Sequence, residues 1–96
     1  MKIDFTKSND ILSVSFEGRL DTTTAPEFES FLCQHYSSIK TLNLNCENLV
    51  YISSAGLRVL LTAHKRLEGN MKLTNVGELV MEVFEMTGFA DVLVIE

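Results

Sequence analysis

Residues 41–57 of this chain read TLNLNCENLVYISSAGL, and the main features of the fold follow from this stretch. Thr41–Cys46 alternates strictly, with Leu42, Leu44 and Cys46 on one face, which predicts a half-buried strand. Residues 47–52 carry the chain to a helix that begins near Ser53. A strand followed along the chain by a helix is half of a β-α-β unit, which predicts parallel strands.

The flanking sequence supplies the other elements. Alternation and turn residues predict a hairpin of two strands around Ser8-Asn9-Asp10, the second strand ending at Gly18. Helical spacing predicts a first helix from Pro26 to about Ser38 and a third over 78–88. The second helix ends at Gly69-Asn70, and its buried face is predicted to be Leu57, Leu60, Leu61, His64 and Leu67. Short strands are expected at Met71–Leu73 and Val92–Ile95. The predicted order is β-β-α-β-α-β-α-β: one α/β domain over residues 1–96, with a mixed, mostly parallel sheet of four to five strands and three main helices.

Composition excludes several classes of protein. A net charge of -5 without a basic run argues against nucleic-acid binding. No apolar run approaches the roughly 20 residues needed to cross a bilayer, and the start of the chain lacks a signal peptide, so we expect a cytoplasmic protein that does not bind membranes. Cys33 and Cys46 are expected to be buried and reduced, with no metal site. A monomer is expected.

The pattern of nucleophiles and bases argues against an enzyme. Ser54 and His64 lie ten positions apart on one predicted helix, about 15 Å along its axis, so they cannot form a nucleophile–base pair. His35 falls within an amphipathic helix, where a packed histidine is expected. No phosphate loop, dinucleotide fingerprint or nucleophile elbow is present, so neither a catalytic residue nor a cofactor is predicted.

The start of the second helix is the candidate functional site. Ser53 can cap the helix while Ser54 faces outward; a capped start with an incidental second serine is the alternative. Gly56 is unfavourable within a helix unless something approaches its backbone closely. Ala55, Arg58, Val59, Thr62 and Arg66 are expected on the outward face, a composition that suits a protein partner. Thr24 with Glu27 has the spacing of a capping box for the first helix.

Three motifs carry a resemblance to a known family. Leu44–Leu57 resembles the pattern L-D-L-S-x-x-x-F-[IM]-D-S-[ST]-G-L, Gly18–Ala25 resembles G-x-[LF]-D-x-x-[TN]-A, and Val80–Phe89 resembles V-x-x-[VL]-[FL]-x-x-[TS]-G-[LF]. In this order they identify the chain as similar to STAS domain proteins, in particular the bacterial anti-sigma factor antagonists (anti-anti-sigma factors). Ser53 stands where the family has aspartate, and Ala55 where it has serine or threonine.

The resemblance implies a switch in transcription regulation. In the family, the serine aligned with Ser54 is phosphorylated by an anti-sigma factor with serine kinase activity. The unphosphorylated antagonist binds that factor and frees the sigma factor, and a PP2C-type phosphatase resets the system. The partner surface is expected to comprise Asp21, Thr22, Thr23, Ser53, Ser54, Ala55, Gly56, Arg58, Val59 and Thr62. The alternative is an accessory subunit, without phosphorylation, of a lipid-transport ATPase or another signalling complex.

Overall fold

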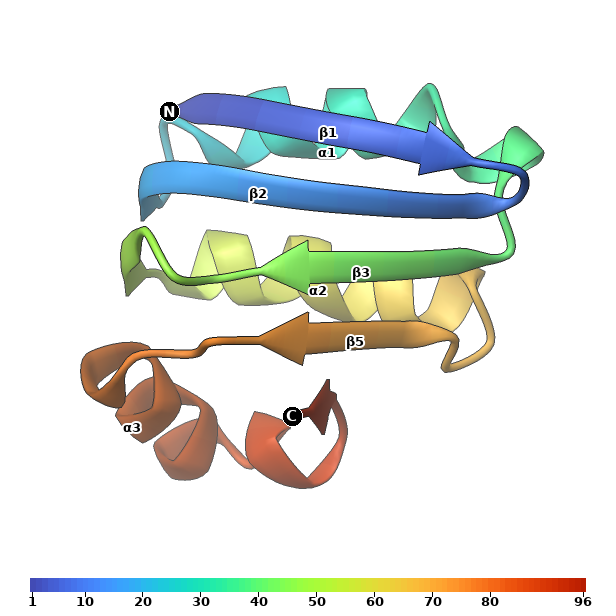
Figure 1. The fold of residues 1–96 in the computed structure, drawn as a ribbon. Coiled ribbons are helices and arrows are strands. Elements are labelled where there is room, and N and C mark those ends of the chain that lie inside the picture. Colours follow the sequence, from blue (N-terminus) through green and yellow to red (C-terminus); the bar gives the residue numbers. More distant parts are fainter.

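The computed structural model describes residues 1–96, and a sheet with helices on one face accounts for most of them (Figure 1). The strands are β1 (Lys2–Ser8), β2 (Ile11–Leu20), β3 (Thr41–Asn45), β4 (Leu49–Ile52), β5 (Met71–Thr74) and β6 (Val94–Ile95). The α-helices are α1 (Ala25–Cys33), α2 (Ser54–Arg66) and α3 (Glu78–Thr87), and short 3-10 turns lie at Tyr36–Ser38 and Phe89–Asp91.

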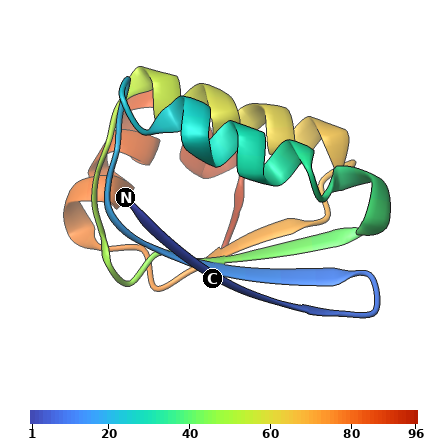
Figure 2. The same ribbon diagram turned by 90° about the horizontal axis from the view of Figure 1, so that it is seen from above.

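The sheet is mixed and mostly parallel, as predicted. β1 pairs antiparallel with β2, whereas every other pairing is parallel, in the order β1-β2-β3-β5-β6. β4 pairs with the last residues of β2, beyond a register shift at Gly18. Seen from above, the helices lie on one side of the sheet and leave the other side open (Figure 2). The predicted α/β fold class is confirmed.

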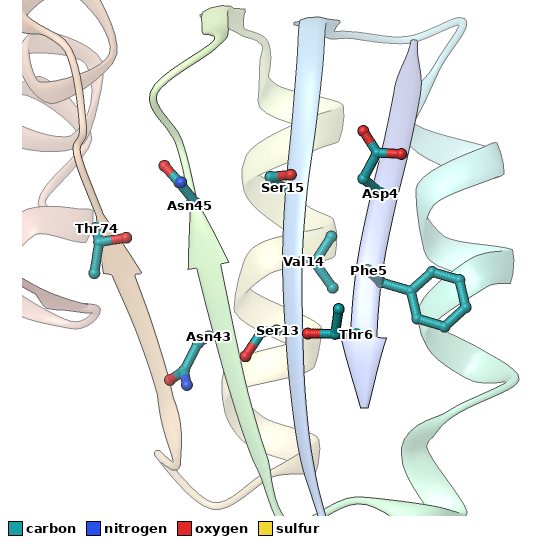
Figure 3. A pocket seen from close by; sticks show the side chains of 9 residues that line it. All are labelled: Asp4, Phe5, Thr6, Ser13, Val14, Ser15, Asn43, Asn45 and Thr74. Carbon is teal, nitrogen blue, oxygen red and sulfur yellow. The ribbon is translucent and has the colours of Figure 1, made fainter. Parts of the chain in front are cut away.

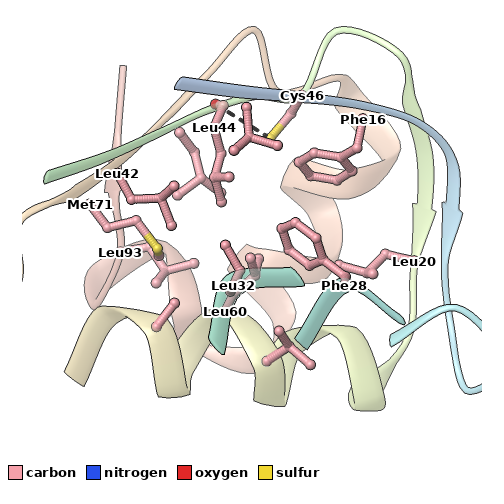
Figure 4. Packing of buried hydrophobic residues seen from close by; sticks show 14 of the residues in the cluster. Phe16, Leu20, Phe28, Leu32, Leu42, Leu44, Cys46, Leu60, Met71 and Leu93 are labelled. Carbon is pink, nitrogen blue, oxygen red and sulfur yellow. Dashed lines mark hydrogen bonds between the residues drawn. The ribbon is translucent and has the colours of Figure 1, made fainter. Parts of the chain in front are cut away.

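The core lies between the sheet and the helices. Strand register places Leu12 opposite Leu42 and Val14 opposite Leu44, so the buried residues of neighbouring strands share one face. Phe16 and Phe28 join the sheet to α1, with ring centroids 5.0 Å apart (Figure 4). No polar or charged residue is among the buried set. The interior therefore supplies packing, and any chemistry must come from the surface.

Several predicted boundaries are wrong. Residues 47–52 were expected to be a connection, but Leu49–Ile52 forms β4. β2 runs past Gly18 to Leu20, because the left-handed backbone of Gly18 (φ +108°) accommodates the register shift. α1 ends at Cys33, and Tyr36–Ser38 form a 3-10 turn instead of continuing the helix. The closing strand shrinks to two residues, because Phe89–Asp91 form a second 3-10 turn just before it.

The two cysteines differ from each other, contrary to the expectation that both are buried. Cys46 lies in the core, and burial raises the pKa of its thiol to about 12. Cys33 is exposed at the end of α1, because the helix presents that position to solvent. Both are free thiols. Among the helices, none is both long and apolar enough to cross a membrane.

Candidate functional site at the start of α2

The junction between β4 and α2 places two serines in different environments. Ser53 has an extended backbone (φ -102°, ψ 177°) and Ser54 is the first helical residue. Ser54 is exposed, whereas Ser53 is half-buried and its Oγ is shielded from solvent. Ser54 therefore presents the accessible hydroxyl of the pair.

Ser53 does not cap the helix through its side chain, contrary to expectation. Its Oγ makes no hydrogen bond, and its carbonyl oxygen accepts the N–H of Leu57 at 2.9 Å. No backbone acceptor contacts the N–H groups of Ser54, Ala55 and Gly56. The first turn of α2 also contains no acidic residue. This helix end therefore keeps its donors and its partial positive charge for an incoming anion or for water.

A compact loop organised by Asp21 follows β2. The Asp21 carboxylate accepts hydrogen bonds from the N–H and hydroxyl of Thr23, at 3.0 and 2.8 Å, and from the N–H of Thr24 at 3.3 Å. These bonds, those to Thr23 first, lower the pKa of Asp21 to about 2, so the carboxylate is ionised at neutral pH. Arg19 lies 3.5 Å away and adds to the effect. Thr22 and Thr23 are exposed on the outside of this loop.

The predicted capping box at Thr24 does not form. Thr24 has helical backbone angles, and its hydroxyl is occupied within the loop, accepting from the Asp21 N–H at 2.9 Å and donating to the Arg19 carbonyl at 2.7 Å. The helical backbone of Thr24 does not place Oγ over the first turn of α1. The hydroxyl therefore stabilises the loop in front of α1 rather than the helix end.

Two contacts fix this loop against α2. The N–H of Ser53 donates to the Leu20 carbonyl at 2.9 Å. Gly56 packs against the same residue so closely that a Cβ there would lie 2.7 Å from the Leu20 oxygen and 2.8 Å from Ile52 Cγ1. Gly56 is buried, so the expectation that it contacts a partner is wrong: its lack of a side chain lets α2 pack against Leu20, the residue directly before the Asp21 loop.

The outward face of α2 differs from the prediction at one important residue. Arg58 and Arg66 are exposed, and Ala55 and Thr62 are half-buried with part of their surface accessible. Val59, expected to face solvent, is 5% exposed. α2 packs beside α1 as well as on the sheet, which makes its buried side wider than a single-face pattern predicts. Leu61 and His64, expected to be buried, are only half-buried.

Sequence reasoning missed an exposed pair next to this junction. The Arg19 guanidinium lies over the Tyr51 ring, 4.3 Å from its centroid, and Arg19 also contacts Asp21. Tyr51 and its neighbour Val50 are 40% and 58% exposed. The sequence signal for this surface was the apolar run before Ser53. The run could be assigned to the surface only after it was recognised as β4, whose middle residues Val50 and Tyr51 are exposed.

The remaining polar features do not assemble a catalytic centre. A hollow of about 410 Å³ on the open face of the sheet is lined by Asp4, Phe5, Thr6, Ser13, Val14, Ser15, Asn43, Asn45 and Thr74 (Figure 3). Apart from Phe5 these side chains are short, and Asp4 is the one charged residue among them. His35 packs against Phe5 and Phe31, and its Nδ1 lies 2.9 Å from the Phe31 carbonyl oxygen. No group of three potential metal ligands occurs in the structure.

Comparison of this sequence with known proteins identifies one family and relatives that share a name. The family model for the STAS domain matches residues 2–96. BtrV of Bordetella bronchiseptica, which carries the provisional name of an anti-sigma factor antagonist, is 33% identical over 96% of this chain and 83% of its own. The anti-sigma-B factor antagonist of Staphylococcus aureus is 29% identical over 97% of this chain and 90% of its own.

Solved structures show the same fold. The antagonist SpoIIAA in its unphosphorylated form gives a TM-score of 0.85 at 19% identity, covering 99% of this chain and 88% of SpoIIAA. Its phosphorylated form gives 0.77 at 18% identity, over 99% of this chain and 91% of that one. These likenesses establish the arrangement of strands and helices described above.

Proposed function

This chain belongs to the STAS domain family, and on that premise we propose that it is an anti-sigma factor antagonist controlled by phosphorylation of Ser54. The unmodified protein binds an anti-sigma factor that is also a serine kinase, and this binding frees a sigma factor. Phosphorylated protein does not bind. The names of the two relatives support an antagonist over an accessory subunit of a transport ATPase.

The observation that carries the proposal is the accessible hydroxyl of Ser54 at the first turn of α2. A kinase must align the γ-phosphoryl group of ATP with that oxygen, remove its proton and release ADP. Ser54 is exposed and can enter a kinase cleft, whereas the Ser53 Oγ is shielded. The two adjacent serines are therefore predicted to differ completely as substrates.

The local electrostatics make a phosphate at Ser54 compatible with the folded state. The adjacent N–H groups and the helix macrodipole favour an anion at this end of α2. Arg58 lies four residues on, is exposed and has no ion-pair partner. Phosphorylation is thus expected to change the surface without unfolding the domain.

The same phosphate is unfavourable within a protein interface. It adds a charge of about -1.5 to -2 beside the ionised Asp21 loop. A partner that closes over Ser54, Thr22 and Thr23 would have to remove water from that charge, which costs binding free energy unless a matching cation is present. A PP2C-type phosphatase would restore binding by hydrolysing the phosphoserine to the hydroxyl and inorganic phosphate.

Phosphosite mapping tests the proposal. The protein is incubated with the anti-sigma kinase of its own organism and ATP, and the products are analysed by tandem mass spectrometry. We expect one phosphate, on Ser54, and none in Ser54→Ala. The matched control Ser53→Ala should be phosphorylated normally, because the Ser53 hydroxyl makes no hydrogen bond whose loss would disturb the site.

Two results would reject the phosphoswitch. One is phosphate on Ser53 or elsewhere with Ser54 unmodified. The other is a complex with the kinase that forms in the absence of ATP but never leads to phosphate transfer. The second result would leave an antagonist or permanent subunit without a phosphorylation cycle.

A further inference from the structure

The outward face of α3 combines large apolar side chains with unpaired acidic ones. Leu79 and Met86 are 70% and 86% exposed, and Val83, which lies between them on the helix, is half-buried. At 100° per residue these three lie in one stripe. α3 already packs on the core through Val80 and Phe84, so the exposed residues are not needed for its packing. Two exposed apolar residues one above the other are unusual on such a short helix.

An acidic row runs beside this stripe. Glu78, Glu82 and Glu85 occupy the neighbouring helical positions, and all three are exposed. α3 contains no basic residue, and the only ion pairs in the molecule, Arg19–Asp21 and Lys72–Glu96, lie elsewhere. Like charges three and four residues apart repel each other on a helix, by a few tenths of a kcal/mol per pair in isolated helices. The charges are therefore uncompensated within the chain.

The acidic row also borders a depression. Glu78, Glu82 and Glu85 line a hollow of about 380 Å³ whose apolar walls are Val76 and Met81. α3 thus presents apolar, acidic and again apolar surface in adjacent strips. A partner complementary to these three strips would place cationic side chains against the acidic row and apolar side chains against the strips on either side. A basic amphipathic protein segment has this pattern.

From this arrangement we propose that the Leu79–Val83–Met86 stripe with its acidic row is a second protein-docking surface, whose occupant is a basic amphipathic segment of another protein. This surface lies on a different helix from Ser54, and its side chains are apolar and acidic. It begins at the same end of the sheet, because α2 and α3 each follow the carboxyl end of a parallel strand, β4 and β5 (Figure 1). The inference does not depend on phosphorylation of Ser54.

An NMR titration tests the proposal. The ¹⁵N-labelled full chain is titrated with a synthetic 14-residue amphipathic helix of leucine and lysine, and with a scrambled peptide of the same composition. We expect chemical shift changes concentrated in α3 with the amphipathic peptide, and much weaker binding of the scrambled one. Affinity should fall with added salt, since exposed charges are screened.

Variants separate the two components of the surface. Met86→Ser removes an apolar anchor and is expected to weaken binding at least about tenfold. Glu82→Lys reverses a charge in the row and is expected to weaken it about fivefold. The matched control is Glu29→Lys, at a glutamate on α1 that is also exposed, and it should leave affinity within about twofold. All three side chains are exposed, so none of these changes should affect folding.

Three results would overturn the proposal. They are shift changes spread over all acidic surfaces, equal binding of the scrambled peptide, and equal loss from Glu29→Lys and Glu82→Lys. Movement of α3 signals with protein concentration alone, together with a dimer in sedimentation velocity, would identify a second copy of this chain as the occupant instead. A failed phosphosite test would leave this surface unaffected.

Discussion

At the scale of single residues, the account depends on how neighbouring side chains differ. Ser53 and Ser54 are adjacent in sequence, yet one hydroxyl is shielded and unpaired while the other faces solvent. Ser53 stands where the family has aspartate. An aspartate there would add a charge at the start of α2, whereas Ser53 leaves that end without an acidic group. Ser54 therefore lies in a more electropositive setting than the family pattern implies.

The titration of Asp21 provides a prediction at this scale. Its pKa is expected near 2, below the ordinary value of 3.8, because the Thr23 N–H and hydroxyl bind the charged form. A lowered native pKa means that the unfolded chain binds the proton more tightly. The stabilisation is therefore complete above about pH 4 and is lost between about pH 4 and pH 2.

Carboxyl ¹³C NMR measures this pKa directly. Thr23→Ala removes the largest cause of the shift and should raise the pKa of Asp21 toward 3.8. An ordinary value in the unmodified protein, or no response to Thr23→Ala, would show that the loop is not organised in this way. The Asp21 carboxylate would still be ionised at neutral pH, but the hydrogen bonds from Thr23 would not hold it in place.

At the scale of elements, the close approach of α2 to Leu20 connects the fold to the site. Gly56→Ser would place Cβ within 3 Å of the Leu20 backbone oxygen and of two side-chain atoms of buried residues, Leu20 Cγ and Ile52 Cγ1. We expect this overpacking to lower the free energy of unfolding by about 1–3 kcal/mol. Urea unfolding should show a lower midpoint with an unchanged slope.

Gly77→Ser is the matched control for this change. Gly77 precedes α3, and an added Cβ there meets nothing within 4 Å. Serine is also favoured over glycine at this position of a helix, so no loss of stability is expected. If Gly56→Ser were as stable as Gly77→Ser, the close packing of α2 on the Asp21 loop would be disproved.

Most elements could be predicted from sequence because their patterns are local. The alternation in 41–46 and the helical spacing in α2 and α3 reflect periodicity that the structure confirms. β4 was missed because Leu49 and Ile52 are buried while Val50 and Tyr51 between them are exposed, so it does not alternate. Val59 was misplaced because α2 also packs beside α1, a tertiary contact that widens its buried side and that the sequence of one helix does not encode.

The candidate site was predictable to a similar degree. The exposure of Ser54 and the need for Gly56 followed from helix-start and glycine chemistry. The direction of the Ser53 hydroxyl and the occupied Thr24 hydroxyl did not, because several hydrogen-bond arrangements fit the same sequence. The Arg19–Tyr51 contact joins two strands and was visible only after their pairing was known.

At the scale of the whole molecule, the fold separates stability from recognition. The core is entirely apolar, and the helices cover only one side of the sheet (Figures 2 and 4). The loop after β2 and the starts of α2 and α3 follow the carboxyl ends of parallel strands, so they gather at one end of the domain. We therefore expect a phosphate at that end to change the surface there while the core stays intact.

The regulatory role of Ser54 predicts that the anti-sigma factor has different affinities for the unmodified and the phosphorylated protein. Isothermal titration calorimetry compares unmodified protein with protein fully phosphorylated on Ser54, circular dichroism confirming that both are folded. We expect binding of the unmodified protein and an affinity at least about a hundredfold lower after phosphorylation, because the partner would have to remove water from the added charge. Equal affinity of the two folded forms would contradict the regulatory role of Ser54.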